Sequence, residues 1–274
     1  MEIISWNIEF WRRVCEKYNT PDDIKNWLNF ANLLLEIDIA FILLQEINPF
    51  YICDKKNYEP NTSNIHNFTI NNKNIYYHEL NKKEYYEPDN IFSDEQQDYP
   101  FWGAAIIAKK NYTFKKNHNY NEKKYIGEYF YGYETLMCYT FESISGKLIT
   151  LINYYKKGKN GNYNYEEAFF NELSKVYNEV NNKNIILLAG DFNPDFDIIK
   201  KIIDIGFIEK TDPNESTMVK YHYHNDCIFV NKHFSEIIKV KKIPSNPLIP
   251  SNDLPDYLYN NFSDHYGFKC IIDL

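Results

Sequence analysis

IILLAGDFN, at residues 185–193, is the segment that best predicts the architecture of this chain. Its first five residues are apolar, a run that is too short for a buried helix and is typical of a β-strand covered on both faces. Asp191 and Asn193 follow directly. In open α/β sheets, ligands gather outside the carboxyl ends of the strands. The segment therefore predicts a buried strand that delivers polar side chains to a site.

Other apolar segments end or begin in the same way. Strands are expected at residues 2–8, 37–44, 147–154 and 227–230, the third of them joined to a strand at 135–141 by a turn at Ser145-Gly146. The polar residues at their ends are Asn7 and Glu9, Gln45 and Glu46, Asn153 and Tyr155, and Asn225 and Asp226, with Asp264 and His265 near the C-terminus. We expect these groups to meet at one site.

The remaining pattern predicts an α/β sandwich formed by one domain over residues 1–274. Apolar residues at helical spacing predict helices at 21–35 and 165–180, and a short helix is expected after Pro194. Further strands are expected at 103–108, 237–241 and 268–272. Residues 57–97 predict a loop with one or two edge strands, and loops are expected at about 110–132 and 243–262.

Composition narrows the functional class. The 274 residues carry a formal net charge of −8, which argues against tight, non-specific binding of duplex nucleic acid. The five cysteines are scattered without a C-x-x-C pair, so neither a zinc site nor a disulfide framework is predicted. The sequence shows no signal peptide and no apolar run of the ~18 residues that a membrane span needs. We expect a cytoplasmic protein.

The polar groups share one chemistry. Asn, Asp and Glu oxygens are hard ligands that suit Mg²⁺, or Mn²⁺ in its place. A histidine beside aspartates can donate to a phosphoryl oxygen, and further carboxylates can orient a water molecule. These are the groups that hydrolysis of a phosphodiester requires.

Four motifs carry a resemblance to a known family. Trp6-Asn7, Leu44-Gln45-Glu46, Gly190-Asp191-Phe192-Asn193 and Ser263-Asp264-His265, in this order, resemble the motifs of the endonuclease/exonuclease/phosphatase superfamily, which includes exonuclease III-like and DNase I-like enzymes. The resemblance spans nearly the whole chain. It implies two β-sheets packed face to face and flanked by helices, a four-layer α/β/β/α sandwich with metal-dependent phosphodiesterase activity.

The resemblance also implies a metal site. Glu46 would be the main ligand of the Mg²⁺ ion, assisted by Asn7 and by Glu9 or Asp264. Whether one or two metal ions act is unsettled within the family, and the sequence leaves both open.

The same resemblance implies catalytic roles. Asp191 would position or deprotonate the attacking water, and Asn193 would hold that water or the phosphate. His265 would donate to a non-bridging phosphate oxygen, with Asp226 fixing its tautomer. Tyr155 stands where many members carry a histidine, so it would either contact the phosphate or pack in the core.

Three further residues are expected to contact substrate. Asn153 belongs to the strand end Asn153-Tyr154-Tyr155, which also carries Tyr155. His222 and His224 share a face with Asp226 if their segment is a strand, with a solvated strand face as the alternative reading.

The pattern as a whole predicts a Mg²⁺-dependent nuclease with DNA or RNA as substrate. Two alternatives stay open. One is a phosphatase or phosphodiesterase that acts on lipid headgroups, inositol phosphates or a 5′-tyrosyl-DNA adduct. The other is a non-catalytic binding module on the same fold, which the intact acidic and histidine positions count against.

Overall fold

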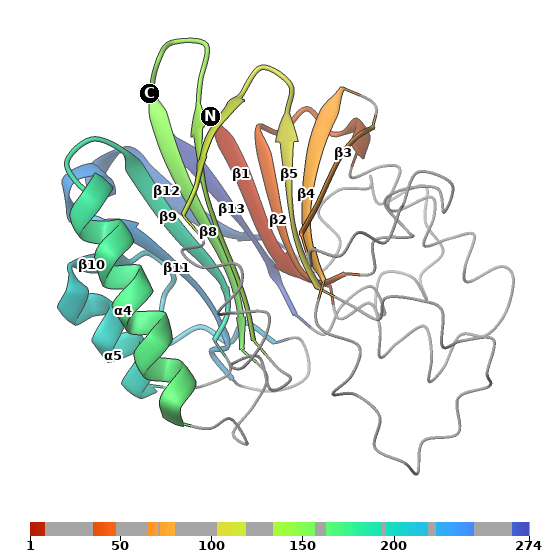
Figure 1. Cartoon of the computed structure of the whole chain (residues 1–274). Coiled ribbons are helices and arrows are strands. Elements are labelled where there is room, and N and C mark those ends of the chain that lie inside the picture. Colours follow the sequence, from red (N-terminus) through yellow and green to blue (C-terminus); the bar gives the residue numbers. More distant parts are fainter. Residues whose placement is uncertain are drawn as a thin grey trace, which may run out of the picture.

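Two β-sheets pack face to face in the computed structural model of this chain (Figure 1). The structure describes residues 1–8, 35–47, 65–70, 72–79, 103–118, 134–156, 163–192, 196–218, 223–243 and 265–273. No helix in these ranges is long and apolar enough to cross a membrane.

The first sheet is formed by seven strands of the described residues. Their order is β12 (Ile238–Ile243), β13 (Gly267–Ile272), β1 (Glu2–Asn7), β2 (Phe41–Ile47), β5 (Gly103–Lys109), β4 (Lys73–Glu79) and β3 (Ile65–Ile70). β1 and β2 run parallel, whereas the other neighbours are antiparallel. The register of β2 with β5 shifts between Leu44 and Ile47, which marks a β-bulge at the carboxyl end of β2.

In the described part of the chain, the second sheet has six strands. Their order is β10 (Phe207–Glu209), β11 (Asp226–Asn231), β9 (Ile185–Asp191), β8 (Leu148–Lys156), β7 (Glu134–Glu142) and β6 (Thr113–Asn117). β8 and β9 are parallel, and the other pairs are antiparallel. The 3₁₀ helix η5 (Lys232–Ile237) joins β11 of this sheet to β12 of the other.

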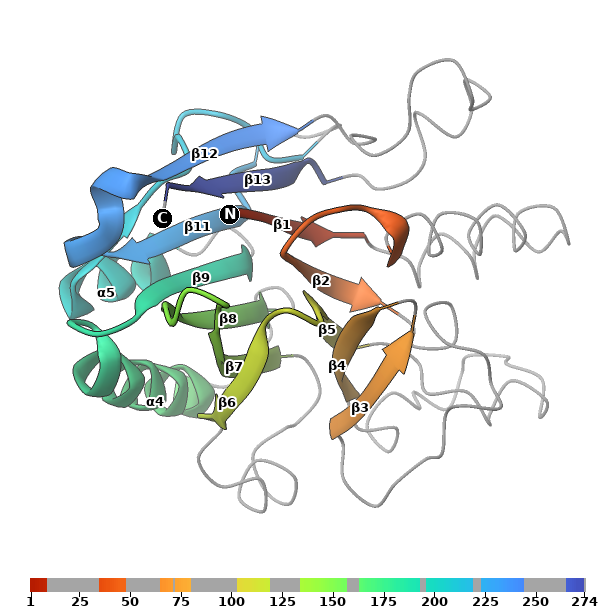
Figure 2. The same ribbon diagram turned by 90° about the horizontal axis from the view of Figure 1, so that it is seen from above.

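Alternation along the strands separates two apolar layers. On β9, Leu187 and Ala189 face the core between the sheets, whereas Ile186 and Leu188 face the helices α4 (Tyr163–Val180) and α5 (Phe196–Ile205). Figure 2 shows α4 and α5 on the side of the six-stranded sheet that faces away from the seven-stranded one. The segment at 185–189 is apolar throughout because both of its faces are covered.

The fold class predicted from the sequence, a face-to-face α/β sandwich, is confirmed. The turn at Ser145-Gly146 also forms, with Gly146 at φ 77°. The predicted helix at 21–35 lies outside the described residues except for Leu35, which is helical together with Glu36.

Two expectations about strands were wrong. The strand expected at 37–44 begins only at Phe41, because Asp38 is exposed and pairs with Lys109 instead of entering a buried strand. The loop expected at 110–132 begins with β6, an exposed edge strand with the sequence TFKKN. Lysines on an edge strand hide the usual apolar alternation.

Candidate functional site

The space between the sheets changes from apolar to polar at one end of the sandwich. On β9 the inward positions Leu187 and Ala189 are followed by Asp191, and on β1 the inward Ile3 shares its face with Asn7. Among the described residues, the buried polar side chains of this end include Ser5, Asn7, Gln45, Asn153, Asp191, Thr217, Asn225, Asp226 and His265. The site is therefore a continuation of the core rather than a surface patch.

Strand direction explains why these residues meet. Asn7 and Asp191 end β1 and β9, whereas Asp226 begins β11, which is antiparallel to β9 and pairs with it at Asp226 and Asp191. His265 lies just before β13, which is antiparallel to β1. Strands of one direction therefore contribute their last residues, and strands of the opposite direction contribute residues at their start.

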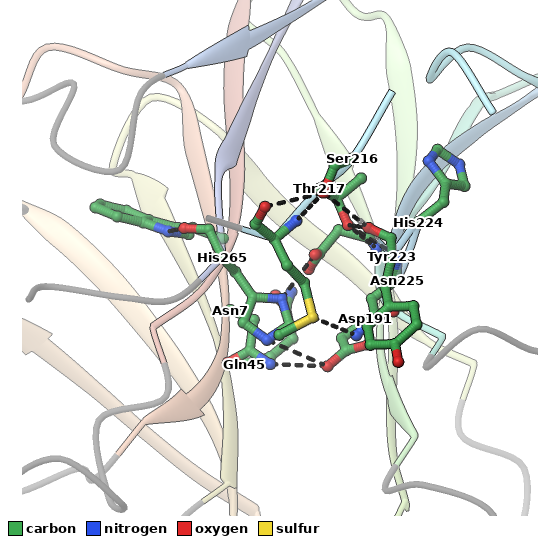
Figure 3. A network of polar contacts seen from close by, with 12 residues as sticks. Asn7, Gln45, Asp191, Ser216, Thr217, Tyr223, His224, Asn225 and His265 are labelled. Carbon is green, nitrogen blue, oxygen red and sulfur yellow. Dashed lines mark hydrogen bonds and ion pairs between the residues drawn. The ribbon is translucent and has the colours of Figure 1, made fainter. Parts of the chain in front are cut away.

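His265 and Asp226 form the central pair of the site. The Nδ1 atom of His265 lies 2.7 Å from Oδ2 of Asp226, within the buried part of the site. A carboxylate oxygen can only accept, so Nδ1 carries a proton and the ring orientation is fixed. The other ring nitrogen, Nε2, then points toward Asp191, with its Oδ2 atom 4.0 Å away (Figure 3).

Asn7 links the seven-stranded sheet to Asp191 of the six-stranded sheet. Its Nδ2 group donates to Oδ2 of Asp191 over 2.9 Å (Figure 3). Asn7 is fully buried, and Asp191 is 2% exposed. Hydrogen bonds to charged groups in buried places are stronger than exposed ones. The carboxylate of Asp191 is thus held between the amide of Asn7 and the ring of His265.

Asn153 crosses the gap between the sheets. Its Nδ2 group donates to the backbone oxygens of Leu44, at 2.9 Å, and Ala105, at 3.0 Å. These carbonyls belong to β2 and β5, where the bulge interrupts the pairing of the two strands. Its Oδ1 atom accepts from Nε2 of Gln45 over 2.6 Å. Asn153 therefore joins the two sheets at the boundary between the apolar core and the site.

This network leaves one oxygen without a donor. The amide of Asn153 must present Oδ1 to Gln45, because its Nδ2 already faces two carbonyls, and Gln45 must then present Nε2. Among the described residues, Oε1 of Gln45 consequently has no hydrogen-bond partner, although the side chain is 0% exposed. An unpartnered buried oxygen costs about 1–3 kcal/mol. A metal ion or its bound water would satisfy it.

Hydrogen bonds to the backbone at and next to His265 and Asp226 hold this pair in place. Nε1 of Trp6 donates to the carbonyl of His265 over 3.1 Å. The hydroxyl of Thr217 accepts from the backbone N–H groups of Asn225 and Asp226, at 2.8 and 3.0 Å, and the carbonyl of Thr217 accepts from Tyr266. Figure 3 shows Thr217 between these two parts of the chain. Both members of the pair are therefore positioned by the same loop residue.

The structure brings together five of the residues expected at the site: Asn7, Asp191, Asp226, His265 and Tyr155. Tyr155 is the neighbour of Asp191 in the register of β8 with β9, and it is 5% exposed. The backbone of Glu46 lies in β2 directly after Gln45, and its side chain is outside the described part of the structure. Outside the described residues altogether are Glu9, Asn193, His222 and Asp264.

Two residues expected to contact substrate use their polar atoms in contacts within the protein. Asn153 is 0% exposed, and both parts of its amide form hydrogen bonds between the sheets. The ring of His224 is turned away from Asp191 (Figure 3), with Nε2 2.8 Å from Oε1 of Glu209 and Nδ1 3.0 Å from the carbonyl of Glu215. Neither ring nitrogen of His224 is directed at the His265–Asp226 pair.

Burial on its own would lower the pKa of His224, but its hydrogen bonds to Glu209 and to the Glu215 carbonyl, with the charges of Glu209 and Asp226, raise the pKa above its ordinary value.

Sequence reasoning assigned no role to Gln45 and missed Thr217. Gln45 could be found only as part of the Leu44-Gln45-Glu46 motif, and Thr217 lies in a segment without any periodic pattern. Trp6 could likewise be identified only as part of the Trp6-Asn7 motif, because the sequence does not reveal its hydrogen bond to the carbonyl of His265.

The chemical types of the oxygen atoms at this end of the sandwich suit a hard divalent cation. The described groups at this end offer carboxylate and amide oxygens, which are the ligands that Mg²⁺ and Mn²⁺ prefer. The unpartnered Oε1 atom of Gln45 is one such oxygen. The residues described here are therefore compatible with the metal that the sequence motifs imply.

The sequence matches no model of a known protein family, and no curated protein matches it. Solved structures do match. The human Nocturnin catalytic domain with bound sulfate anion is 14% identical, with a TM-score of 0.62 over 100% of this chain and 93% of that one. TDP2 from D. rerio complexed with single strand DNA product is 14% identical, with a TM-score of 0.58 over 100% and 99%.

An endonuclease/exonuclease/phosphatase family protein from Leptotrichia buccalis is 16% identical, with a TM-score of 0.56 over 100% of both chains. These similarities cover this chain from end to end. The chain has the fold of the endonuclease/exonuclease/phosphatase superfamily.

Proposed function

We propose that this protein is a Mg²⁺-dependent phosphodiesterase that hydrolyses DNA or RNA by attack of water. The observation that carries the proposal is the joining of Asn7, Asp191, Asp226 and His265, from both sheets, at the buried polar end of the sandwich. A protein with the same fold is known in complex with a single-stranded DNA product, which supports nucleic acid as the substrate class.

His265 would act on the phosphate. Its Nδ1–H donates to Asp226, so Nε2 is the ring nitrogen that would meet a non-bridging phosphate oxygen as negative charge builds there. The carboxylate of Asp226 stabilises the protonated ring, which is the form that donates from Nε2. Asp226 is therefore a positioning residue that acts through His265.

Asp191 would act on the water. Its Oδ2 atom is held by Asn7 and lies beside Nε2 of His265, so the carboxylate faces the place where the phosphate would be bound. A carboxylate held in this way can orient a water molecule and take its proton during attack. His265, the proton donor, and Asp191, the base, would then lie on either side of the phosphate.

Asn7 and Glu46 would hold the divalent ion, with Glu9 or Asp264 as further ligands. When bound, the ion neutralises charge on the phosphate and stabilises the leaving oxygen. Gln45 would complete this part of the site because its buried Oε1 atom can accept from a water ligand.

The test is hydrolysis of a labelled substrate panel with Mg²⁺, comparing the full chain with Asp191→Asn. The panel contains single- and double-stranded DNA, RNA, a 5′-tyrosyl oligonucleotide, a sphingolipid and an inositol polyphosphate. We expect cleavage of a nucleic acid that the variant loses by roughly 10²-fold or more. Thermal melts of both proteins should agree, since Asn keeps the size of the side chain.

Other outcomes would revise the proposal. Turnover of only the lipid or the inositol phosphate would keep the chemistry and overturn the substrate class. Cleavage that persists in Asp191→Asn would show that another group acts as base. No turnover of any substrate, with nucleic acid bound equally by both proteins, would identify a non-catalytic binding module.

A further inference from the structure

A second group of metal-ligating side chains lies on the other face of the six-stranded sheet. Glu209 ends β10, His224 precedes β11, and Cys227 is the second residue of β11. One ligand atom from each of them lies within 4.8 Å of the other two. Cys227 belongs to the apolar layer that also contains α4 and α5, whereas its neighbour Asp226 reaches the site between the sheets. The two groups of residues are thus separated by β11 itself.

Hydrogen bonds determine what His224 presents to this group. A backbone carbonyl can only accept, so the 3.0 Å contact with Glu215 requires a proton on Nδ1. Nε2 then faces a carboxylate oxygen of Glu209 at 2.8 Å. A bare nitrogen lone pair would repel that oxygen, so a positive species must lie between the two atoms. Only a proton or a metal ion can serve.

The surroundings resemble a prepared ligand shell. In metal sites the ligating histidine commonly donates its other N–H to a carbonyl, and the ligating carboxylate is hydrogen-bonded in turn. Here Glu215 provides the carbonyl, and the hydroxyl of Thr211 donates to Oε1 of Glu209 over 2.9 Å. Both ligands on the edge of the sheet are therefore oriented toward Cys227 by outer contacts.

We propose that Glu209, His224 and Cys227 form a three-residue site for a zinc-class transition-metal ion, distinct from the phosphodiesterase site. One oxygen, one nitrogen and one sulfur ligand suit Zn²⁺ or Co²⁺ and not Mg²⁺. Tetrahedral coordination needs about 3.3 Å between two ligand atoms, so Nε2 of His224 and Oε1 of Glu209 would separate slightly to admit the ion. A water molecule would take the fourth position.

The ion would link Glu209 of β10 to His224, which precedes β11, and to Cys227 of β11. The hydroxyl of Thr217 accepts from the backbone N–H of Asp226. The ion would bind Cys227, the next residue, on the opposite face of the sheet. The expected effect is on stability, because metal binding to the folded state alone raises the free energy of unfolding. The proposal does not depend on the activity proposed above.

The test is titration of the full chain with Co²⁺ and Zn²⁺ after chelator treatment. We expect a thiolate-to-cobalt charge-transfer band in the near ultraviolet that saturates at one thiolate-bound Co²⁺ per chain, and a higher melting temperature with Zn²⁺. Cys227→Ala should lose the band, and the matched control Cys270→Ala, a buried cysteine of the other sheet, should keep it.

Two results would overturn the site. One is the absence of the band from the unsubstituted chain, which would leave a protonated His224 paired with Glu209. The other is a band that survives in Cys227→Ala, which would assign it to another cysteine. If Cys227→Ala does not fold, Glu209→Gln replaces it. The affinity of this variant for Zn²⁺ should fall by at least the roughly 10–100-fold that loss of an outer-shell partner causes, and an unchanged affinity would contradict the proposal.

Discussion

Replacing Gly190 by alanine should damage the fold at the residue before Asp191. Gly190 has φ 151°, a conformation that residues with a Cβ rarely adopt. A Cβ atom built there would lie 1.7 Å from the backbone oxygen of Tyr154. Tyr154 is the partner of Gly190 in the parallel pairing of β8 and β9, so the obstruction is backbone and no side-chain rotation can remove it.

The cost can be estimated from these two effects. Backbone strain contributes about 1–3 kcal/mol, and forcing an extra group into a packed interior contributes a similar amount. A total of about 4 kcal/mol would remove a large part of the stability of an ordinary domain. For a chain of this size it corresponds to a fall in Tm of roughly 8–16 °C.

Gly146→Ala is the matched control for this measurement. Gly146 also has a positive φ, 77°, but a Cβ atom there would meet no atom of the described residues within 4 Å. Its cost should be about 1 kcal/mol, from backbone conformation alone. Both variants and the parent are compared by thermal and urea unfolding. If Gly190→Ala melts within two or three degrees of the control, roughly the effect of 1 kcal/mol, the inferred clash with Tyr154 is wrong.

Three further results are expected. Chelation should abolish phosphodiester hydrolysis, and Mg²⁺ or Mn²⁺ should restore it; activity that survives chelation would exclude a metal-dependent reaction. Asp226→Asn should lower kcat by roughly 10²–10⁴-fold through the tautomer of His265, with an unchanged melt; an unchanged kcat would show that another group orients the ring. Burial, aided by Lys116 and opposed by Glu179, lowers the pKa of His118, so neutral His118 stabilises the folded state above the ordinary histidine pKa of about 6.5. The free energy of unfolding should therefore fall as the pH drops through that value toward the lowered pKa. His118→Gln should flatten this pH dependence, whereas the exposed control His233→Gln should leave it unchanged. Equal pH dependence in the parent and both variants would contradict the role of His118.

The strands covered on both faces were the most predictable part of the fold. A run such as 185–189 can only lie between two apolar layers, and its polar ending therefore indicates an edge of the sheet where a site can form. Edge elements gave no such signal. β6 is exposed along most of its length, and β10 has only three residues, so neither produces a recognisable alternation.

The sequence predicted which residues approach the polar end but not which atoms they use. Asn153 and His224 have the residue types that contact phosphates, yet their hydrogen-bond partners lie in other segments and are not revealed by local patterns. Asn153 bonds Gln45 across 108 positions, and His224 bonds Glu209, on the neighbouring strand. Such choices are made by tertiary contacts rather than by strand periodicity.

The contact between Asn153 and Gln45 explains how the site depends on both sheets at once. Leu43 and Leu151, two positions earlier on the same strands, are packed in the apolar core. On the polar side of the Asn153–Gln45 contact, Nδ2 of Asn7 in one sheet donates a hydrogen bond to Oδ2 of Asp191 in the other over 2.9 Å. That distance is maintained only if the sheets keep their spacing and register, and the amide of Asn153 fixes both by bonding two backbone carbonyls of the opposite sheet. No single segment of the sequence contains this geometry, because it belongs to the packing of one sheet on the other.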